Sequence, residues 1–222
     1  TKTDIKEQTI CSVDLGINTD AVCTIMQADG TVLGRKFIDF PSDKDRLYHV
    51  LGRIRRFQRQ HGSRQTQSRW AYAKRLNMEL ARKTAAAITT YVAENHTDVI
   101  IFEYLEMQGK MCEHQAHRKG IRVSRISARN TSRLAYDGSG PVVRNPENHS
   151  LCTFPTGKQY NCDLSAAYNI GARYFIRELL KPFSETERSL LEAKVPSVKR
   201  RTSCVYADLR LLSAELASQK AA

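Results

Sequence analysis

Residues 9–37 read TICSVDLGINTDAVCTIMQADGTVLGRKF, and this stretch decides the predicted fold. It contains three apolar runs, at 9–14, 21–27 and 31–37, each rich in β-forming residues, which predict three consecutive strands. The dipeptide Asp29-Gly30 lies between the second and third runs and suits a type I′ hairpin turn. The chain is therefore predicted to begin with three antiparallel strands.

Helices and further strands follow this start. Ser42, with Asp45 three residues later, predicts a capped helix that continues to about residue 60. A second long helix is predicted for residues 67–95, a loop or short helix for 108–119, and strands for 99–102 and 121–126. The remaining helices are predicted at 164–180, after the capping pair Ser184 and Glu187, and at 205–219. This order favours an α/β fold: a mixed sheet with helices on its faces, as in ribonuclease H-like proteins.

The composition is that of a globular protein with an anionic partner. The 222 residues are 41% hydrophobic, which is enough for a substantial core. The six cysteines are scattered and suggest no disulfide framework, so we expect a reducing compartment. No apolar stretch is long enough to span a membrane, and residues 1–8 carry no signal-peptide core. The net charge of +12 indicates a polyanionic partner.

The positive charge is concentrated in one region. Residues 53–83 contain ten basic residues and a single acid, Glu79. A solvated helix face usually mixes both signs, so this stretch predicts contact with nucleic acid. Residues 118–133 are also basic and contain no acid. The predicted nucleic-acid-binding residues are Arg53, Arg55, Arg56, Arg59, Arg64, Arg69, Lys74, Arg75 and Arg133.

Three carboxylates stand at comparable places in the predicted fold. Asp14 ends the first strand, Glu103 ends the fourth, and Asp163 begins a late helix. Adjacent parallel strands would bring the first two together, and a helix could lay the third across them. Oxygen ligands suit Mg²⁺, and a pair of such ions activates water for hydrolysis. Each residue alone also fits an ordinary role, as a turn cap, a solvated strand end or a helix N-cap, so spacing leaves both interpretations open.

Four segments carry a family resemblance. The segments VDLGIN (13–18), VIIFEYLEM (99–107) and CDLSAAYNIGAR (162–173) resemble, in this order, the three segments of the RuvC-like nuclease domain of TnpB proteins and type V CRISPR effectors. The segment GIRVSRISARNTSR (120–133) is similar to the strand and Asn-Thr-Ser stretch before the zinc ribbon of that family. The similarity covers about residues 9–175. It implies that Asp14, Glu103 and Asp163 are catalytic ligands of two Mg²⁺ ions.

The resemblance also implies an organisation and partners. The segments would be 1–40 (first RuvC segment), 41–97 (basic helical insertion), 98–134 (second segment and following strand), 135–161 (degenerate zinc-ribbon or target-loading insertion), 162–182 (third segment) and 183–222 (C-terminal helices). Guide RNA and target DNA would be the partners, and the basic insertion would lie near their duplex. The N-terminal recognition lobes of the same polypeptide would be missing from this sequence. The expected setting is bacterial or phage-encoded antiviral defence in the cytoplasm, with no membrane partner.

Two departures from the family pattern matter. Ser165 stands where the family's third segment usually has Asn. Ala135 and Gly138 replace the first cysteine pair of the zinc ribbon, and Cys152 with Pro155 the second. One cysteine of four cannot hold tetrahedral zinc, so we expect no zinc. This loss favours a type V effector over a TnpB protein.

Other side chains receive ordinary interpretations. Cys112, His114 and His117 form at best half a zinc site. The histidines at 49, 61, 96 and 149 each stand alone in the sequence and are expected to be surface or packed residues. The aromatic residues Trp70, Tyr72 and Tyr91 lie at helical spacing, which predicts packing rather than base stacking.

Two alternative functions stay open. The first is a guide-dependent effector that binds DNA but cleaves it little, which the retention of all three acids argues against. The second is a stand-alone ribonuclease H-like junction resolvase, for which the basic stretch 53–83 has no obvious use and which dimerisation in solution would favour.

Overall fold

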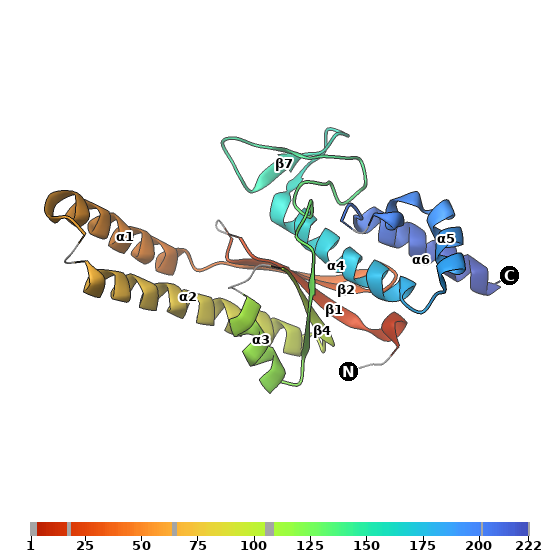
Figure 1. Ribbon diagram of the computed structural model, residues 1–222, viewed down its shortest axis with the longest axis horizontal. Coiled ribbons are helices and arrows are strands. Elements are labelled where there is room, and N and C mark those ends of the chain that lie inside the picture. Colours follow the sequence, from red (N-terminus) through yellow and green to blue (C-terminus); the bar gives the residue numbers. More distant parts are fainter. Residues whose placement is uncertain (1–3, 17–18, 64–65, 105–108, 201, 222) are drawn as a thin grey trace.

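A computed structural model describes residues 4–16, 19–63, 66–104, 109–200 and 202–221. Its centre is a five-stranded mixed sheet in the order β3-β2-β1-β4-β5 (Figure 1). The strands β1 (Thr9–Asp14), β2 (Ala21–Gln27) and β3 (Val32–Ile38) pair antiparallel. The strands β4 (Val99–Glu103) and β5 (Arg122–Ile126) continue the sheet in parallel with β1. The predicted fold class, an α/β ribonuclease H-like mixed sheet flanked by helices, is confirmed.

Each face of the sheet has its own core. On one face, Ile10, Val22 and Ile101 pack against α4 (Cys162–Leu180) and against α6 (Tyr206–Ala221) behind it. On the other face, alternate residues of the same strands pack against α2 (Gln67–Glu94) and α3 (Gly109–Arg118). Because helices cover both faces, the central strands are apolar on both sides, which is why they read as continuous apolar runs in the sequence.

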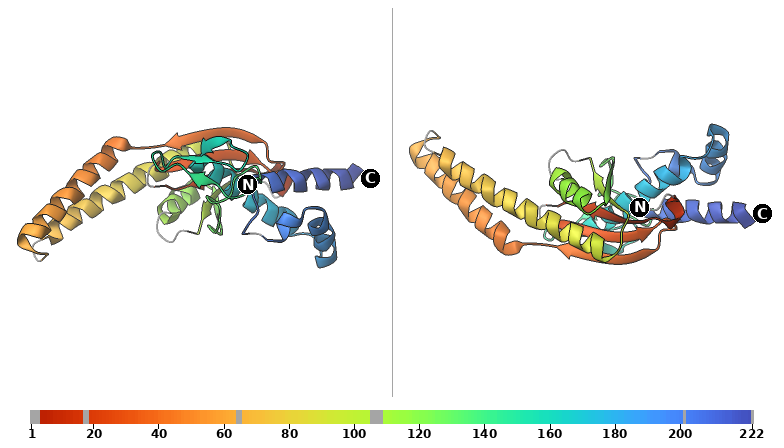
Figure 2. Two further views of the ribbon diagram at one scale, coloured as in Figure 1. Left: turned by 90° about the horizontal axis from the view of Figure 1, so that it is seen from above. Right: turned by 90° about the horizontal axis from the view of Figure 1, so that it is seen from below.

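Helices α1 (Pro41–His61) and α2 form an arm that projects from the sheet (Figure 2). The arm has a small core of its own, built on Val50, Ile54 and Ala73. The predicted Ser42–Asp45 cap is wrong, because α1 already begins at Pro41, with Phe40 at the N-cap and no side-chain cap. Proline suits the first helical position since its fixed φ is already helical and it has no N–H to satisfy.

The aromatic side chains of α2 behave differently from one another. Tyr72 and Tyr91 are partly buried and pack against neighbouring cores, as predicted. Trp70 is 43% exposed, so the predicted packing role is wrong for this residue. Helical spacing identifies a face of a helix but does not say how far a neighbouring helix extends to cover it.

Residues 135–161 form a small separate layer beside the start of α4 (Figure 1). It contains a three-stranded sheet of β6 (Val143–Arg144), β7 (Leu151–Thr153) and β8 (Gln159–Asn161). Ala135, Cys152, Phe154 and Cys162 form its buried core. Apolar packing thus occupies places that the family resemblance assigns to zinc-ligating cysteines.

The remaining elements lie near the two ends of the chain. A 3-10 turn, Ile5–Glu7, precedes β1. After α4 come α5 (Glu185–Lys194), a second 3-10 turn, Pro196–Lys199, and α6. The capping box predicted for Ser184 and Glu187 is present. Among the described residues, no helix is long and apolar enough to cross a membrane.

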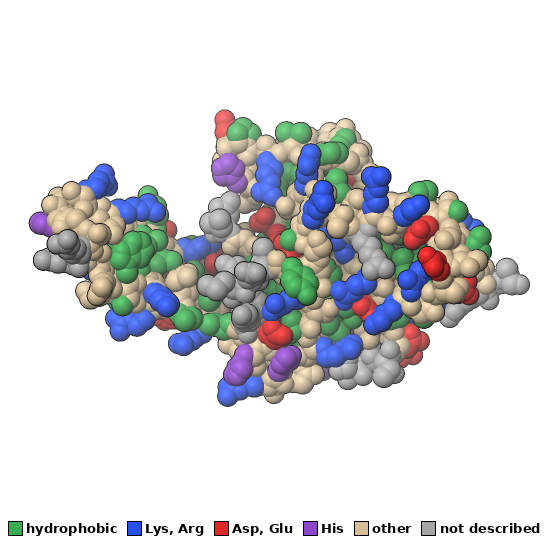
Figure 3. Space-filling view, viewed as in Figure 1, with side chains coloured by type: hydrophobic (Ala, Val, Ile, Leu, Met, Phe, Trp, Pro, Cys, Tyr) green, Lys and Arg blue, Asp and Glu red, His purple; other side chains and the backbone are tan. Residues whose placement is uncertain are grey.

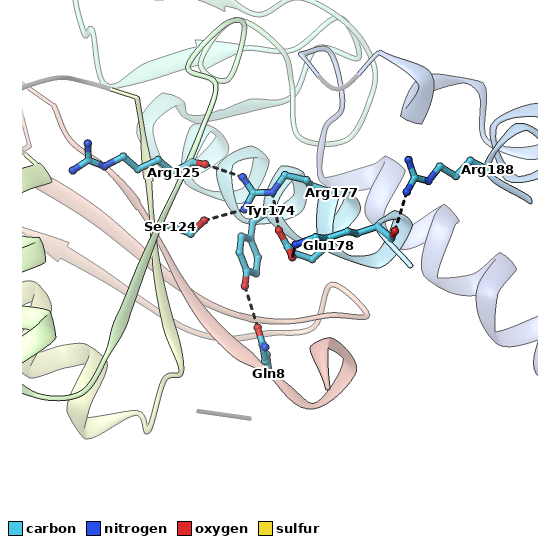
Figure 4. Close-up of polar contacts among 8 residues, drawn as sticks. Gln8, Ser124, Arg125, Tyr174, Arg177, Glu178 and Arg188 are labelled. Atoms are coloured by element: carbon cyan, nitrogen blue, oxygen red, sulfur yellow. Dashed lines mark hydrogen bonds and ion pairs between the residues drawn. The ribbon is translucent and has the colours of Figure 1, made fainter. Parts of the chain in front are cut away.

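Polar side chains hold the C-terminal half of α4 against the sheet (Figure 4). Arg177 donates to the carbonyl of Arg125 and to the hydroxyl of Ser124, both on β5, each at 2.9 Å. Tyr174 donates to the side chain of Gln8 beside the start of β1 at 3.0 Å. These bonds set the rotation of α4 about its axis, which decides where its other polar side chains point.

The cap of α5 gives a direct test of local stability. Replacing Ser184 by alanine removes an acceptor for the amide of Glu187, and we expect it to lower the free energy of unfolding by about 1 kcal/mol. The matched control is Ser189→Ala in the interior of the same helix, which we expect to be neutral or slightly stabilising. Urea unfolding of both variants measures the difference, and equal effects would contradict the capping role.

Candidate active site

The three predicted carboxylates come together at one edge of the sheet. Asp14 is the last residue of β1, and Glu103 is the last residue of β4. The two strands are parallel neighbours with Ser12 opposite Ile101, so both carboxylates leave the sheet at the same edge. Asp163 is the second residue of α4, which packs across β1. All three line one open pocket of about 400 Å³.

The pocket wall contains further polar groups. Arg144 from β6 and His149 from the loop after it line the pocket together with Ser132, Leu15 and Gly16. In the space-filling view, acidic side chains lie in a recess below basic and histidine side chains (Figure 3). The insertion at 135–161 therefore supplies positive and titratable groups opposite the carboxylates.

Burial makes all three carboxylates costly to ionise, and repulsion by the other two adds to this cost at Asp14. Burial, together with the charges of Glu103 and Asp163, raises the pKa of Asp14 to about 8, and Arg144 opposes this rise. Burial also raises the pKa values of Glu103 and Asp163. A cation in the pocket would relieve this repulsion and favour the ionised forms.

The donor set fits a hard divalent cation by its chemistry. All three acidic side chains offer carboxylate oxygens, the ligands that Mg²⁺ takes in proteins. In the described part of the chain, however, no three His, Cys, Asp or Glu side chains are grouped closely enough to hold a metal ion. Glu103 accepts a hydrogen bond from the hydroxyl of Thr131. Residues 14, 103 and 163 could therefore hold Mg²⁺ only by drawing together around it.

Sequence reasoning missed part of this pocket. His149 is expected from the sequence to be an isolated surface or packed residue, and the structure corrects this by placing it at the pocket with Arg144. No periodicity marks either residue, because both lie in irregular chain whose path depends on the small β6–β8 sheet. Their position follows from tertiary structure alone.

The predicted basic residues lie mainly on the arm. The side chains of Arg53, Arg55, Arg56, Arg59, Arg69, Lys74, Arg75 and Arg133 are exposed, and Arg64 lies outside the described residues. Arg69 stacks over Phe57 at 4.2 Å and Arg75 over Tyr72 at 5.8 Å. Among the described residues, the exposed residues of this set form no ion pair with an acid.

The alternative half-site for zinc does not assemble. Cys112 is buried against the sheet, whereas His114 and His117 are exposed on α3. The thiol and the two imidazoles therefore do not converge as a tetrahedral site requires.

Comparison with known proteins supports the fold. No family model matches this chain, and no curated protein matches it. A solved structure that does match is the cryo-EM structure of the Cas12f1–sgRNA–target DNA complex, with a TM-score of 0.56 and 17% sequence identity. The two chains share a fold. The match covers 77% of this chain but only half of the Cas12f1 chain.

The raised pKa of Asp14 predicts how stability depends on pH. The pKa of an unfolded Asp is about 4, whereas burial raises the pKa of folded Asp14 to about 8. Between these values the unfolded chain binds fewer protons than the folded protein, so stability falls as pH rises. In metal-free buffer we expect Asp14→Asn to gain about 1–3 kcal/mol over the parent between pH 5 and pH 9. The matched control is Asp45→Asn on the exposed face of α1. Urea unfolding across this range measures the gain, and a difference that does not change with pH would contradict the prediction.

Proposed function

We propose that this chain is the RuvC-like catalytic domain of an RNA-guided type V CRISPR effector, a Mg²⁺-dependent DNA endonuclease. The observation that carries the proposal is the meeting of Asp14, Glu103 and Asp163 at one pocket. These residues come from three segments far apart in the sequence, and each of them lies in a segment that resembles the family. The fold shared with Cas12f1 supports the same assignment.

In the proposed reaction the three carboxylates would hold two Mg²⁺ ions. The ions, when bound, supply an activated water and stabilise the departing 3′ oxygen of the cleaved phosphodiester. Asp14 would hold the cations together with Glu103 and Asp163, because burial and then the charges of these two residues raise its pKa, which shows that it interacts with both. Arg144 faces the same pocket and would hold a non-bridging oxygen of the phosphate.

The arm would hold nucleic acid without reading its sequence. Its exposed guanidinium groups suit phosphate, and sequence specificity would come from pairing between guide RNA and target DNA. The Cas12f1 structure contains sgRNA and target DNA, which supports these partners here. The lost zinc-ribbon cysteines favour a type V effector over a TnpB protein.

One observation favours a second candidate. The three carboxylates are not grouped closely enough to hold a metal ion. An effector that binds DNA under guidance and cleaves it little would need no such grouping. The experiment below separates the two candidates.

We expect the full-length effector, loaded with guide RNA, to cleave single-stranded and target DNA only when Mg²⁺ is present. Asp14→Ala should abolish cleavage while leaving binding of guide and target unchanged, because it removes the ligand that interacts with both other carboxylates. A gel cleavage assay with a parallel binding assay checks this, and Asp45→Ala on α1 is the control. A parent protein that binds guide and target but cuts nothing would establish the second candidate instead.

The arm predicts a salt-dependent contribution to binding. In Arg55→Gln/Arg56→Gln, nucleic-acid affinity should fall for all sequences alike, and the slope of log affinity against log salt should decrease by about 1 for each phosphate that the arm no longer neutralises. The matched control is Lys199→Gln/Arg200→Gln, which removes the same charge from exposed positions outside the arm. Fluorescence anisotropy at several salt concentrations measures both slopes, and equal slopes would argue against nucleic-acid binding by the arm.

A further inference from the structure

Helix α4 carries a stripe of four polar side chains at every fourth position: Ser165, Asn169, Arg173 and Arg177. Residues four apart lie one above the other on the same face of a helix. Three of these side chains are almost fully buried, Asn169 completely and Arg173 to within 5%. Burying a guanidinium and an amide is costly unless they find hydrogen-bond partners, so the stripe needs a specific neighbour.

The main neighbour is the backbone of residues 124–136, while the carbonyl of Cys204 and the amide of Tyr206 bond to Arg173 and Asn169 from the other side. Ser165 accepts from the amide of Tyr136 at 3.2 Å. Asn169 donates to the carbonyls of Thr131 and Leu134 at 2.9 and 2.8 Å. The stripe therefore binds this segment at successive points, with the segment running in the opposite direction to the helix.

The other two side chains of the stripe continue the pattern. Arg173 donates to the carbonyls of Ser127 and Arg129 at 3.1 and 2.6 Å. Arg177 donates to the carbonyl of Arg125 at 2.9 Å. Five carbonyls of a segment that has little regular structure after β5 are thus fixed by one helix.

The segment held in this way contains Thr131, which is 1% exposed and donates to Oε1 of Glu103. The hydroxyl oxygen of Thr131 also lies 2.8 Å from the carbonyl oxygen of Ala128, which would accept its hydrogen bond if Glu103 did not. Asn130, just before it, has a φ of 65°, a left-handed conformation that Asn tolerates better than most residues. The backbone thus adopts an uncommon conformation at the point where the threonine reaches the carboxylate.

We propose that Thr131 is the positioning residue for Glu103, and that the polar stripe of α4 sets the place of Thr131. Helix α4 then fixes the positions of two of the three carboxylates. It carries Asp163 itself, and it positions Glu103 through residues 124–136. This inference rests on the proposed function, since it matters only if Glu103 is a metal ligand. Thr131 engages one carboxylate oxygen and leaves Oε2 for a cation.

The charge of Arg173, like the bond from Thr131, stabilises the ionised form of Glu103. Burial raises the pKa of Glu103, and the bond from Thr131 and the guanidinium of Arg173 both oppose this rise. Both interactions favour the ionised carboxylate that a metal requires. Groups that orient a ligand through a hydrogen bond typically change metal affinity by about 10–100-fold when they are removed.

The test compares Thr131→Val with Thr131→Ser in the full-length effector bound to guide RNA. Valine keeps the shape and removes the hydroxyl, whereas serine keeps the hydroxyl. We expect Thr131→Val to weaken Mn²⁺ binding, measured by electron paramagnetic resonance, by about 10–100-fold, and Thr131→Ser to recover most of it. The kcat for cleavage should fall in Thr131→Val at an unchanged KM for DNA.

The controls separate this inference from the proposed function. Asp14→Ala should abolish Mn²⁺ binding, and if it does not, or if the parent binds no Mn²⁺, the proposed function fails and the inference with it. If the parent binds Mn²⁺ through Asp14 and Thr131→Val binds it equally well, the function stands and the positioning role is overturned. If Thr131→Val does not fold in metal-free buffer, Thr131→Cys replaces it, because its thiol is only a weak donor.

Discussion

The strand β1 pairs in parallel with β4, and the positions of Asp14 and Glu103 depend on this pairing. A parallel pair cannot be joined by a tight turn, because the chain must return to the starting end of the sheet before the second strand begins. Here the return path runs through β2, β3 and the two arm helices. The parallel pairing brings the carboxyl ends of two distant segments to one edge, and Asp14 and Glu103 occupy those ends.

The second constraint is the burial of α4 between the sheet and the C-terminal helices. A helix buried on all sides is usually apolar all round, but this one keeps four polar residues on one face. Their partners include backbone carbonyls of residues 125–134 and the amide of Tyr136, most of them outside regular strands and helices. Each neutral bond contributes about 1 kcal/mol net and each guanidinium bond about 1.5–3 kcal/mol, and removing one member would also leave a buried group without a partner. The stripe therefore specifies one conformation of residues 124–136 more than it adds to overall stability.

Much of the fold could be predicted because its elements have strong periodic signals, such as the apolar runs at β1 and β4 and the long pattern of α2. The meeting of Asp14, Glu103 and Asp163 was predictable from their places at element ends, whereas their catalytic role stays a proposal. Arg144 and His149 were not predictable, since irregular chain carries no period. Ser165 stands where the family resemblance predicts Asn, and the hydroxyl of Ser165 accepts a hydrogen bond from the amide of Tyr136.

The arm also has a mechanical consequence. Helix α2 is one continuous helix of 28 residues, roughly 42 Å long at 1.5 Å per residue. Its last turns, with Ile88 and Val92, are embedded in the core beneath β1 and β4, while its first turns lie at the far end of the arm. One end of the helix is thus held in the core, and the other end lies away from the sheet. A load applied to the tip is transmitted as torque to the strands whose ends bear Asp14 and Glu103.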